Sequence, residues 1–276
     1  LNLGWKNQVY LDVTGRNDWS SALVYANGTG NHSYFYPSVS GSWIISETFR
    51  EQLPEWISFA KVRGSWAQVG NDTDPYYVNQ AYGFGTIELP NGGNIYTNTL
   101  NTIMKASNLK PERKNAWEIG LDFRTFKNRL NLDVTYYKEN TKDQIMEIAT
   151  PWVSGISTQL INAGNIQNSG VEIMLNATPV QTKEFTWDTQ VNFSTNKNKI
   201  IELADGINEY TLGTYDNLKI LAVAGGNYGE IWGTTYLRVT DENSPYYGKM
   251  LLNDAGLPQG DSKIQKIGDQ QATCLV

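Results

Sequence analysis

The stretch Trp117-Glu118-Ile119-Gly120-Leu121-Asp122-Phe123-Arg124 alternates large apolar residues with charged or small ones. Successive side chains of a β-strand point to opposite faces, so this alternation predicts a strand with one apolar and one polar face. After a short turn, Leu130-Asn131-Leu132-Asp133-Val134-Thr135-Tyr136-Tyr137 repeats the pattern. Together the two runs indicate neighbouring antiparallel strands that separate two different environments.

The same period of two recurs along most of the chain. It predicts strands at residues 7–15, 34–46, 57–69, 114–125, 130–141, 166–178 and 185–195, with loops and weaker strands over residues 196–276. The connections alternate between long and short, with the longest expected at residues 70–113 and 141–165. The clearest runs have about 12 residues, whereas soluble strands have about 5–6 and tilted membrane strands about 9–11. These features are typical of an all-β, antiparallel, up-and-down transmembrane β-barrel.

The composition excludes several classes of protein. The 276 residues carry 28 Asp and Glu against 22 Lys and Arg, a net charge of −6, which argues against a nucleic-acid partner. A single Cys, Cys274, and a single His, His32, leave no disulfide framework and no His/Cys metal site. We therefore expect no catalytic residue, no metal and no cofactor, and a protein that is not an enzyme.

The polar faces of the strands carry the candidate functional charges. Glu118 and Asp122 lie four residues apart on one strand face, about 14 Å at the usual rise, which is too far for a glycosidase pair. A charge network that faces the barrel lumen is the better interpretation. Its expected members are Glu118, Asp122, Arg124, Asp133 and Glu172.

Aromatic residues are frequent in the long connections. Six of them are candidates for stacking against sugar rings or peptide side chains: Trp19, Tyr34, Tyr76, Tyr77, Tyr82 and Trp152. The alternative is that such rings form an interfacial belt or pack within the loops.

A soluble alternative explains part of the same pattern. A β-sandwich carbohydrate-binding module would share the aromatic residues and the acidic charge, but its apolar faces would meet each other instead of lipid. The two folds differ in whether the apolar strand faces are covered by protein.

Five ordered motifs resemble those of one family. Two motifs are similar to signatures of TonB-dependent outer-membrane receptors. The first is Asn-Leu-Lys-Pro-Glu-Arg at 108–113, followed by Trp117-Glu118-Ile119-Gly120-Leu121-Asp122. The second is the stretch 165–172, which ends in Asn-Ser-Gly-Val-Glu. Residues 36–47, 61–71 and 229–233 narrow the resemblance to the SusC/RagA branch found in Bacteroidota.

This resemblance implies a particular assembly and location. The family's barrel has about 22 strands, so residues 1–276 are expected to be a partial barrel domain with roughly seven to ten of them, without the plug domain. The resemblance further implies a nutrient importer in the outer membrane of a Gram-negative cell, in contact with outer-membrane lipid. Its expected partners are a SusD-like surface lipoprotein, TonB acting through the plug and N-terminal region, and an oligosaccharide or peptide ligand.

Overall fold

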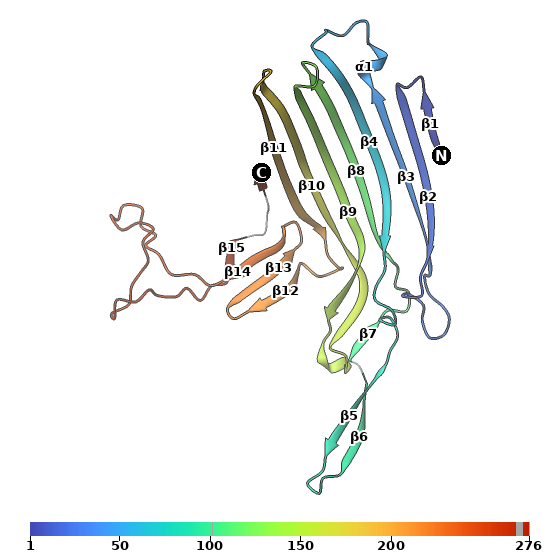
Figure 1. The fold of residues 1–276 in the computed structure, drawn as a ribbon. Helices are drawn as coiled ribbons and strands as arrows, with labels where there is room; N and C mark the ends of the chain where they lie inside the picture. The colour runs from blue at the N-terminus through green and yellow to red at the C-terminus, as the bar shows by residue number, and fades with distance from the viewer. Residues whose placement is uncertain (101, 269–272, 276) are drawn as a thin grey trace. The chain divides into compact units, whose positions relative to one another are not determined.

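The computed structural model describes residues 1–100, 102–268 and 273–275. It divides into two compact units, Leu1–Asn196 with Thr273–Val276, and Lys197–Ala272. The first unit is built on one large, curved antiparallel sheet of long strands (Figure 1).

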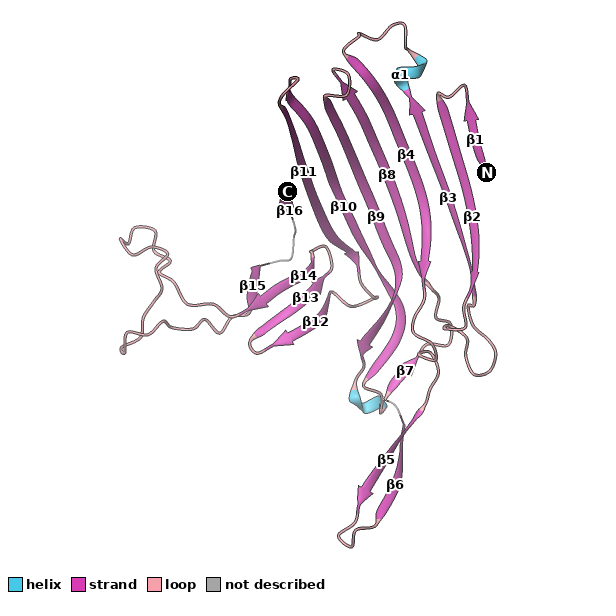
Figure 2. Cartoon of the chain, viewed as in Figure 1, coloured by secondary structure: helices cyan, strands magenta, loops and turns pink. Residues whose placement is uncertain are grey.

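The strands of this sheet follow the chain in an almost unbroken up-and-down order (Figure 2). Across the sheet lie β1 (Asn2–Trp5), β2 (Val9–Trp19), β3 (Ser33–Ile44), β4 (Ile57–Asn71), β8 (Glu112–Thr125), β9 (Leu130–Ala149), β10 (Thr158–Gln181), β11 (Thr186–Glu202) and β16 (Thr273–Leu275). The short β7 (Ile103–Lys105) pairs in parallel with β10 and makes the sheet ten-stranded over the residues described. Within that part of the chain the sheet does not close, because β1 and β16 form its two borders.

The two ends of the sheet differ. At the loop end, residues 20–32, 72–111 and 150–157 connect the strands; at the turn end, residues 126–129 and 182–185 do so, together with a segment that contains the short helix α1 (Ile45–Thr48). A 3-10 turn, η1 (Trp152–Ser154), lies in the last of the loops. No helix in the described ranges is long and apolar enough to cross a membrane.

Two connections differ from the sequence-based expectation. Most of residues 141–165, expected to be a long loop, belongs to β9 and β10, whose ladder continues as far as Thr158 opposite Ala149. The alternation is lost there because Asp143 and Gly164 both adopt positive φ angles, 58° and 83°, and break the period of two. The connection 70–113 contains a hairpin of its own, β5 (Tyr82–Glu88) and β6 (Asn94–Leu100).

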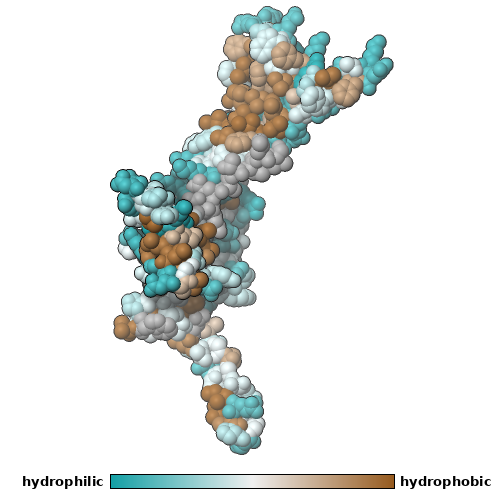
Figure 3. All heavy atoms as spheres, turned by 90° about the vertical axis from the view of Figure 1, so that its left-hand side faces the viewer, coloured by the Kyte–Doolittle hydropathy of each residue, from teal (hydrophilic) through white to brown (hydrophobic). Residues whose placement is uncertain are grey.

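The long strands share one apolar face, defined by the register. Ile119 of β8 lies opposite Gly64 and Tyr136, and Leu121 lies opposite Val62 and Val134. Ile119 is 63% exposed, and hydrophobic side chains gather over the upper part of the sheet in Figure 3. A soluble sandwich would bury this face under a second sheet. The sandwich alternative is therefore not favoured.

The buried core of the first unit lies at the loop end. Five buried residues from four separate segments form it: Leu23, Tyr34, Val78, Leu109 and Leu160. Alternation along β3 places Tyr34 on the same face as Ser42, which lies opposite Arg63. The loops therefore pack against the polar face of the sheet.

The second unit contains a four-stranded antiparallel sheet. Its strands are β12 (Glu209–Tyr215), β13 (Leu218–Val223), β14 (Tyr228–Gly233) and β15 (Gln265–Gly268). Glu230 of β14 is 5% exposed and accepts hydrogen bonds from Lys266 Nζ at 2.7 Å and Trp232 Nε1 at 3.0 Å. Burial raises the pKa of Glu230, but these bonds and the Asn227 N–H outweigh it and hold the pKa below its usual value.

Candidate functional site

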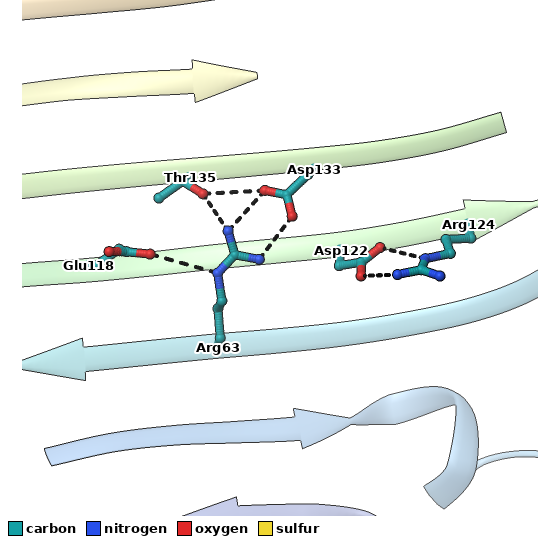
Figure 4. Close-up of polar contacts among 6 residues, drawn as sticks. All are labelled: Arg63, Glu118, Asp122, Arg124, Asp133 and Thr135. Atoms are coloured by element: carbon teal, nitrogen blue, oxygen red, sulfur yellow. Dashed lines mark hydrogen bonds and ion pairs between the residues drawn. The ribbon is translucent and has the colours of Figure 1, made fainter. Parts of the chain in front are cut away.

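The polar face of the sheet carries an arginine that joins three strands (Figure 4). Arg63 of β4 donates from Nη1 to Asp133 Oδ2 at 3.0 Å and from Nη2 to Asp133 Oδ1 at 2.9 Å. Nη2 also donates to Thr135 Oγ1 at 2.6 Å, and Nε lies 3.7 Å from Glu118 Oε1. Because Asp133 and Thr135 belong to β9, the guanidinium crosses the intervening strand β8.

A glycine makes this crossing possible. Gly120 of β8 lies opposite Arg63 on one side and Thr135 on the other. A Cβ atom at Gly120 would stand 2.5 Å from Arg63 Nε and 2.6 Å from Cζ, closer than carbon contacts allow. The side chain of Arg63 therefore occupies the space that any other residue at position 120 would fill.

The same arrangement recurs two strands further on. Tyr137 of β9 passes over Gly170 of β10, where a Cβ would meet the backbone oxygen of Thr195 and would stand 2.5 Å from the Tyr137 hydroxyl. That hydroxyl donates to Asn196 Oδ1 at 3.2 Å. Asn196 belongs to β11, so this side chain also bonds to the second strand along. Both glycines lie in the sequence motifs noted above, 117–122 and 165–172.

The expected charge network divides into two groups. Asp122 and Asp133 lie directly opposite each other, an unfavourable pairing, and each has its own arginine. Arg124 Nη2 donates to Asp122 Oδ2 at 2.8 Å, whereas Arg63 binds Asp133 and lies near Glu118. Glu172, on β10, lies opposite Thr135. Sequence reasoning missed Arg63, although its alternation with Val62 and Gly64 already placed it on the polar face.

The structure separates the six loop aromatics. Tyr34 is 7% exposed and packs in the loop-end core, and it contributes to the lining of a polar cavity there. Trp19 is 72% exposed, but alternation from Val13 along β2 places it on the apolar face with Phe35. It belongs to β2, because the strand continues past the expected end at residue 15, and it also borders a polar cavity at the loop end.

The other rings remain at the loops. Tyr76 is 83% exposed, and Tyr82 is 64% exposed on the β5–β6 hairpin. On the same face of that hairpin Phe84, which the sequence reasoning did not select, is 88% exposed. Trp152 lies in η1, and its side chain is outside the described residues.

Tyr77 belongs to a small charged group beside a cavity. Its hydroxyl donates to a Glu147 carboxylate oxygen, and Lys105 Nζ lies 4.1 Å from its ring centroid. Burial lowers the pKa of Lys105, and the charge of Glu147 opposes this only in part. The cavity has a volume of about 540 Å³. Its lining combines aliphatic side chains with one aromatic ring, Lys105 and a few polar groups: Ala26, Val78, Leu100, Ile103, Met104, Ile156, Tyr25, Asn27, Asn79, Gln80 and Ser107.

A second cavity of about 420 Å³ lies between β2, β3 and β4 at the loop end and is mainly polar. Arg16 and Asp18, which form an ion pair, line it together with Tyr36 and Asp72. In the described ranges no group of three or more His, Cys, Asp or Glu side chains is arranged to hold a metal ion. Both cavities lie near the loops and not along the middle of the strands.

Long antiparallel strands, an exposed apolar face and a polar face with ion pairs define the open wall of an outer-membrane β-barrel. Comparison with known proteins gives the family. Residues 1–263 match the family model described as "TonB dependent receptor-like, beta-barrel". The chain belongs to this family.

The similar proteins are TonB-dependent receptors, as the sequence motifs predict. TonB-dependent receptor P26 of Formosa agariphila is 33% identical over 206 residues, 74% of this chain and 20% of that protein. TonB-dependent receptor SusC of Bacteroides thetaiotaomicron is 28% identical over 285 residues, 96% of this chain and 27% of that protein. This chain thus spans about a fifth to a quarter of the curated relatives. The expected SusC/RagA resemblance and outer-membrane location are confirmed.

Solved structures support the fold. A structure of the RagAB peptide importer in its closed-closed state has a TM-score of 0.72 with 23% identity, and the match covers 96% of this chain and 29% of that chain. Its open-open state also gives a TM-score of 0.72, with 22% identity. The expected antiparallel barrel architecture is confirmed, as an open part of a barrel.

Proposed function

We propose that this chain forms part of the wall and mouth of an outer-membrane importer for oligosaccharides or peptides. Uptake is energised by TonB acting on a plug domain, and a SusD-like lipoprotein covers the mouth. The observation that carries the proposal is the polar face, because a charge network on the inner side of an apolar barrel wall suits a wet lumen. Glu118, Asp122, Arg124, Asp133 and Glu172 then face the lumen. The protein acts as a transporter and catalyses no reaction.

The cavity beside Lys105 favours the peptide class. Sugar rings bind to flat aromatic faces with convergent polar groups, whereas this lining has a single aromatic ring, Tyr25, among mainly aliphatic side chains and suits an apolar side chain. Tyr77 contacts the lining residue Lys105 with its ring and binds Glu147 with its hydroxyl. The exposed rings of Tyr76 and Tyr82 lie on the same connection between β4 and β8.

Uptake by cells tests the importer. In a host that lacks its own copy, the full receptor containing this chain should restore uptake of a labelled hydrophobic hexapeptide, and loss of TonB should abolish that uptake. Uptake that persists without TonB would contradict the proposal.

Binding by the purified receptor tests the peptide class separately. Ile103→Asp should weaken hexapeptide binding at least tenfold, because it places a carboxylate in the aliphatic lining. Ile87→Asp on the β5–β6 hairpin, outside that lining, serves as the matched control. If both variants bound the hexapeptide equally well, the cavity would not be part of the peptide-binding site. The result of the uptake experiment would not be affected.

A further inference from the structure

The apolar face ends abruptly at one level on four adjacent strands. In the row Gly64, Ile119, Tyr136 and Val171, no side chain is charged. One row nearer the loop end come Trp66, Trp117, Lys138 and Ser169, and the two tryptophan rings lie 6.1 Å apart. Tryptophan at the end of an apolar band marks the interface between membrane and water. This row therefore marks the level of the lipid headgroups.

Beyond the tryptophans the same face becomes an unbroken row of amides. Gln68, Asn115, Asn140 and Gln167 lie side by side across β4, β8, β9 and β10. Gln167 Nε2 donates to Asn140 Oδ1 at 3.2 Å, so the row is partly ordered by its own hydrogen bonds. Amides in this position present donors and acceptors suited to the hydroxyl groups of a sugar.

The next row holds two cations directly opposite each other, Arg113 and Lys142. Like charges in facing positions of an antiparallel ladder destabilise it unless an anion lies between them. Asp143 accepts hydrogen bonds from Arg113 Nε and Nη2 at 3.0 and 2.8 Å and so compensates one of the two cations. In the described part of the chain, no carboxylate oxygen lies within 4 Å of Lys142 or of Lys138, and both side chains are exposed.

We infer that this surface, which we name the basic border, binds the phosphate groups of a phosphorylated glycolipid in the outer leaflet of the membrane. The basic border consists of Lys138, Arg113 and Lys142 with the amide row between them. Three cations face one carboxylate here, although the whole chain has a net charge of −6. The surface continues directly from the lipid-facing apolar rows, so the headgroup of a neighbouring lipid reaches it without leaving the membrane.

Lipid titration of the purified full receptor in detergent tests this inference. The probe is bisphosphorylated lipid A, with the same lipid freed of phosphate as a comparison. Lys138→Gln and Lys142→Gln should each weaken binding about fivefold and the double variant about thirtyfold, since a basic residue near an anionic membrane surface contributes roughly that factor. Raising the salt concentration should reduce the difference between the parent and the double variant.

Lys127→Gln is the matched control, because Lys127 lies in the β8–β9 turn at the opposite end of the sheet. It should leave lipid A binding unchanged, and circular dichroism should find the same strand content in all variants. Equal affinity of the double variant and the parent would overturn the inference. So would equal binding of the lipid with and without phosphate.

Discussion

Replacing Gly120 with alanine should disconnect Arg63 from β9. The new methyl group would lie 2.5 Å from Arg63 Nε and 2.9 Å from Cγ, so the middle of the side chain has to move and not only its flexible end. The displaced guanidinium would lose its two bonds to Asp133 and the one to Thr135. Asp133 would then face Asp122 across the ladder without its arginine.

The expected loss follows from the strength of these bonds. Hydrogen bonds to charged groups contribute about 1.5–3 kcal/mol each when buried. The side chains of Arg63 and Asp133 are 32% and 30% exposed, so solvent reduces the combined contribution to about 1–3 kcal/mol. A glycine-to-alanine change in an unstrained strand is itself favourable by about 0.4–1 kcal/mol through the unfolded chain. We therefore expect a net loss of up to about 2.5 kcal/mol in the free energy of unfolding.

Urea unfolding in lipid vesicles, followed by tryptophan fluorescence, measures this change. Gly64→Ala is the control, because a Cβ there meets only Glu118 O at 3.8 Å. In a background of Arg63→Ala, the Gly120→Ala change should become neutral or slightly stabilising, and the coupling between the two sites should equal the lost contact. An equal loss from Gly120→Ala with and without Arg63 would refute the reasoning.

Three further outcomes are expected. Gly170→Ala should destabilise the receptor in urea unfolding, because the added methyl would meet first the backbone oxygen of Thr195 and then the Tyr137 hydroxyl at 2.5 Å; Tyr137→Phe should remove only the part of the loss that is due to the hydroxyl. Leu109→Ala should cost about 2–5 kcal/mol and speed proteolysis of the loops, since Leu109 is completely buried in the loop-end core. The pKa of Glu230 is lower in the folded state than its ordinary value of 4.5. Ionised Glu230 therefore stabilises the second unit fully above pH 4.5, and this stabilisation is lost as the pH falls through the pKa of the folded state. Hydrogen exchange of β14 against pH should follow this loss, and Glu230→Gln should flatten the profile.

The alternation of apolar and polar residues alone predicted many of the long strands of the sheet. The runs around Ile119 and Val134 have apolar side chains every second residue, and the structure pairs these residues across β8 and β9. The pattern worked because lipid on one side and polar groups on the other impose a strict period of two. It failed near Asp143 and Gly164, where two positive φ angles interrupt the period while the ladder continues.

The candidate site was less predictable, because it depends on distances across strands. Nothing local to Arg63 indicates that its partner lies two strands away, 70 residues further along the chain. Trp19 was placed in a loop because the polar residues around it hide the end of β2, and only the pairing with β3 assigns it to the apolar face. The pairing register of the strands, and not the residue type, determines which groups Arg63 contacts and on which face Trp19 lies.

Gly120 and Gly170, the glycines of the motifs 117–122 and 165–172, have similar surroundings in the sheet. A glycine weakens a strand, since it has no side chain to pack and loses more entropy on ordering than other residues do. Gly120 and Gly170 nevertheless occupy the middle of long strands, and each lies beneath a side chain that bonds to the second strand along. Backbone hydrogen bonds join only adjacent strands. The Arg63–Asp133 and Tyr137–Asn196 contacts instead join strands that are separated by one strand, on the polar face of the sheet. We infer that Arg63 and Tyr137 help to hold the curvature of the sheet, because each side chain joins two strands that are not adjacent.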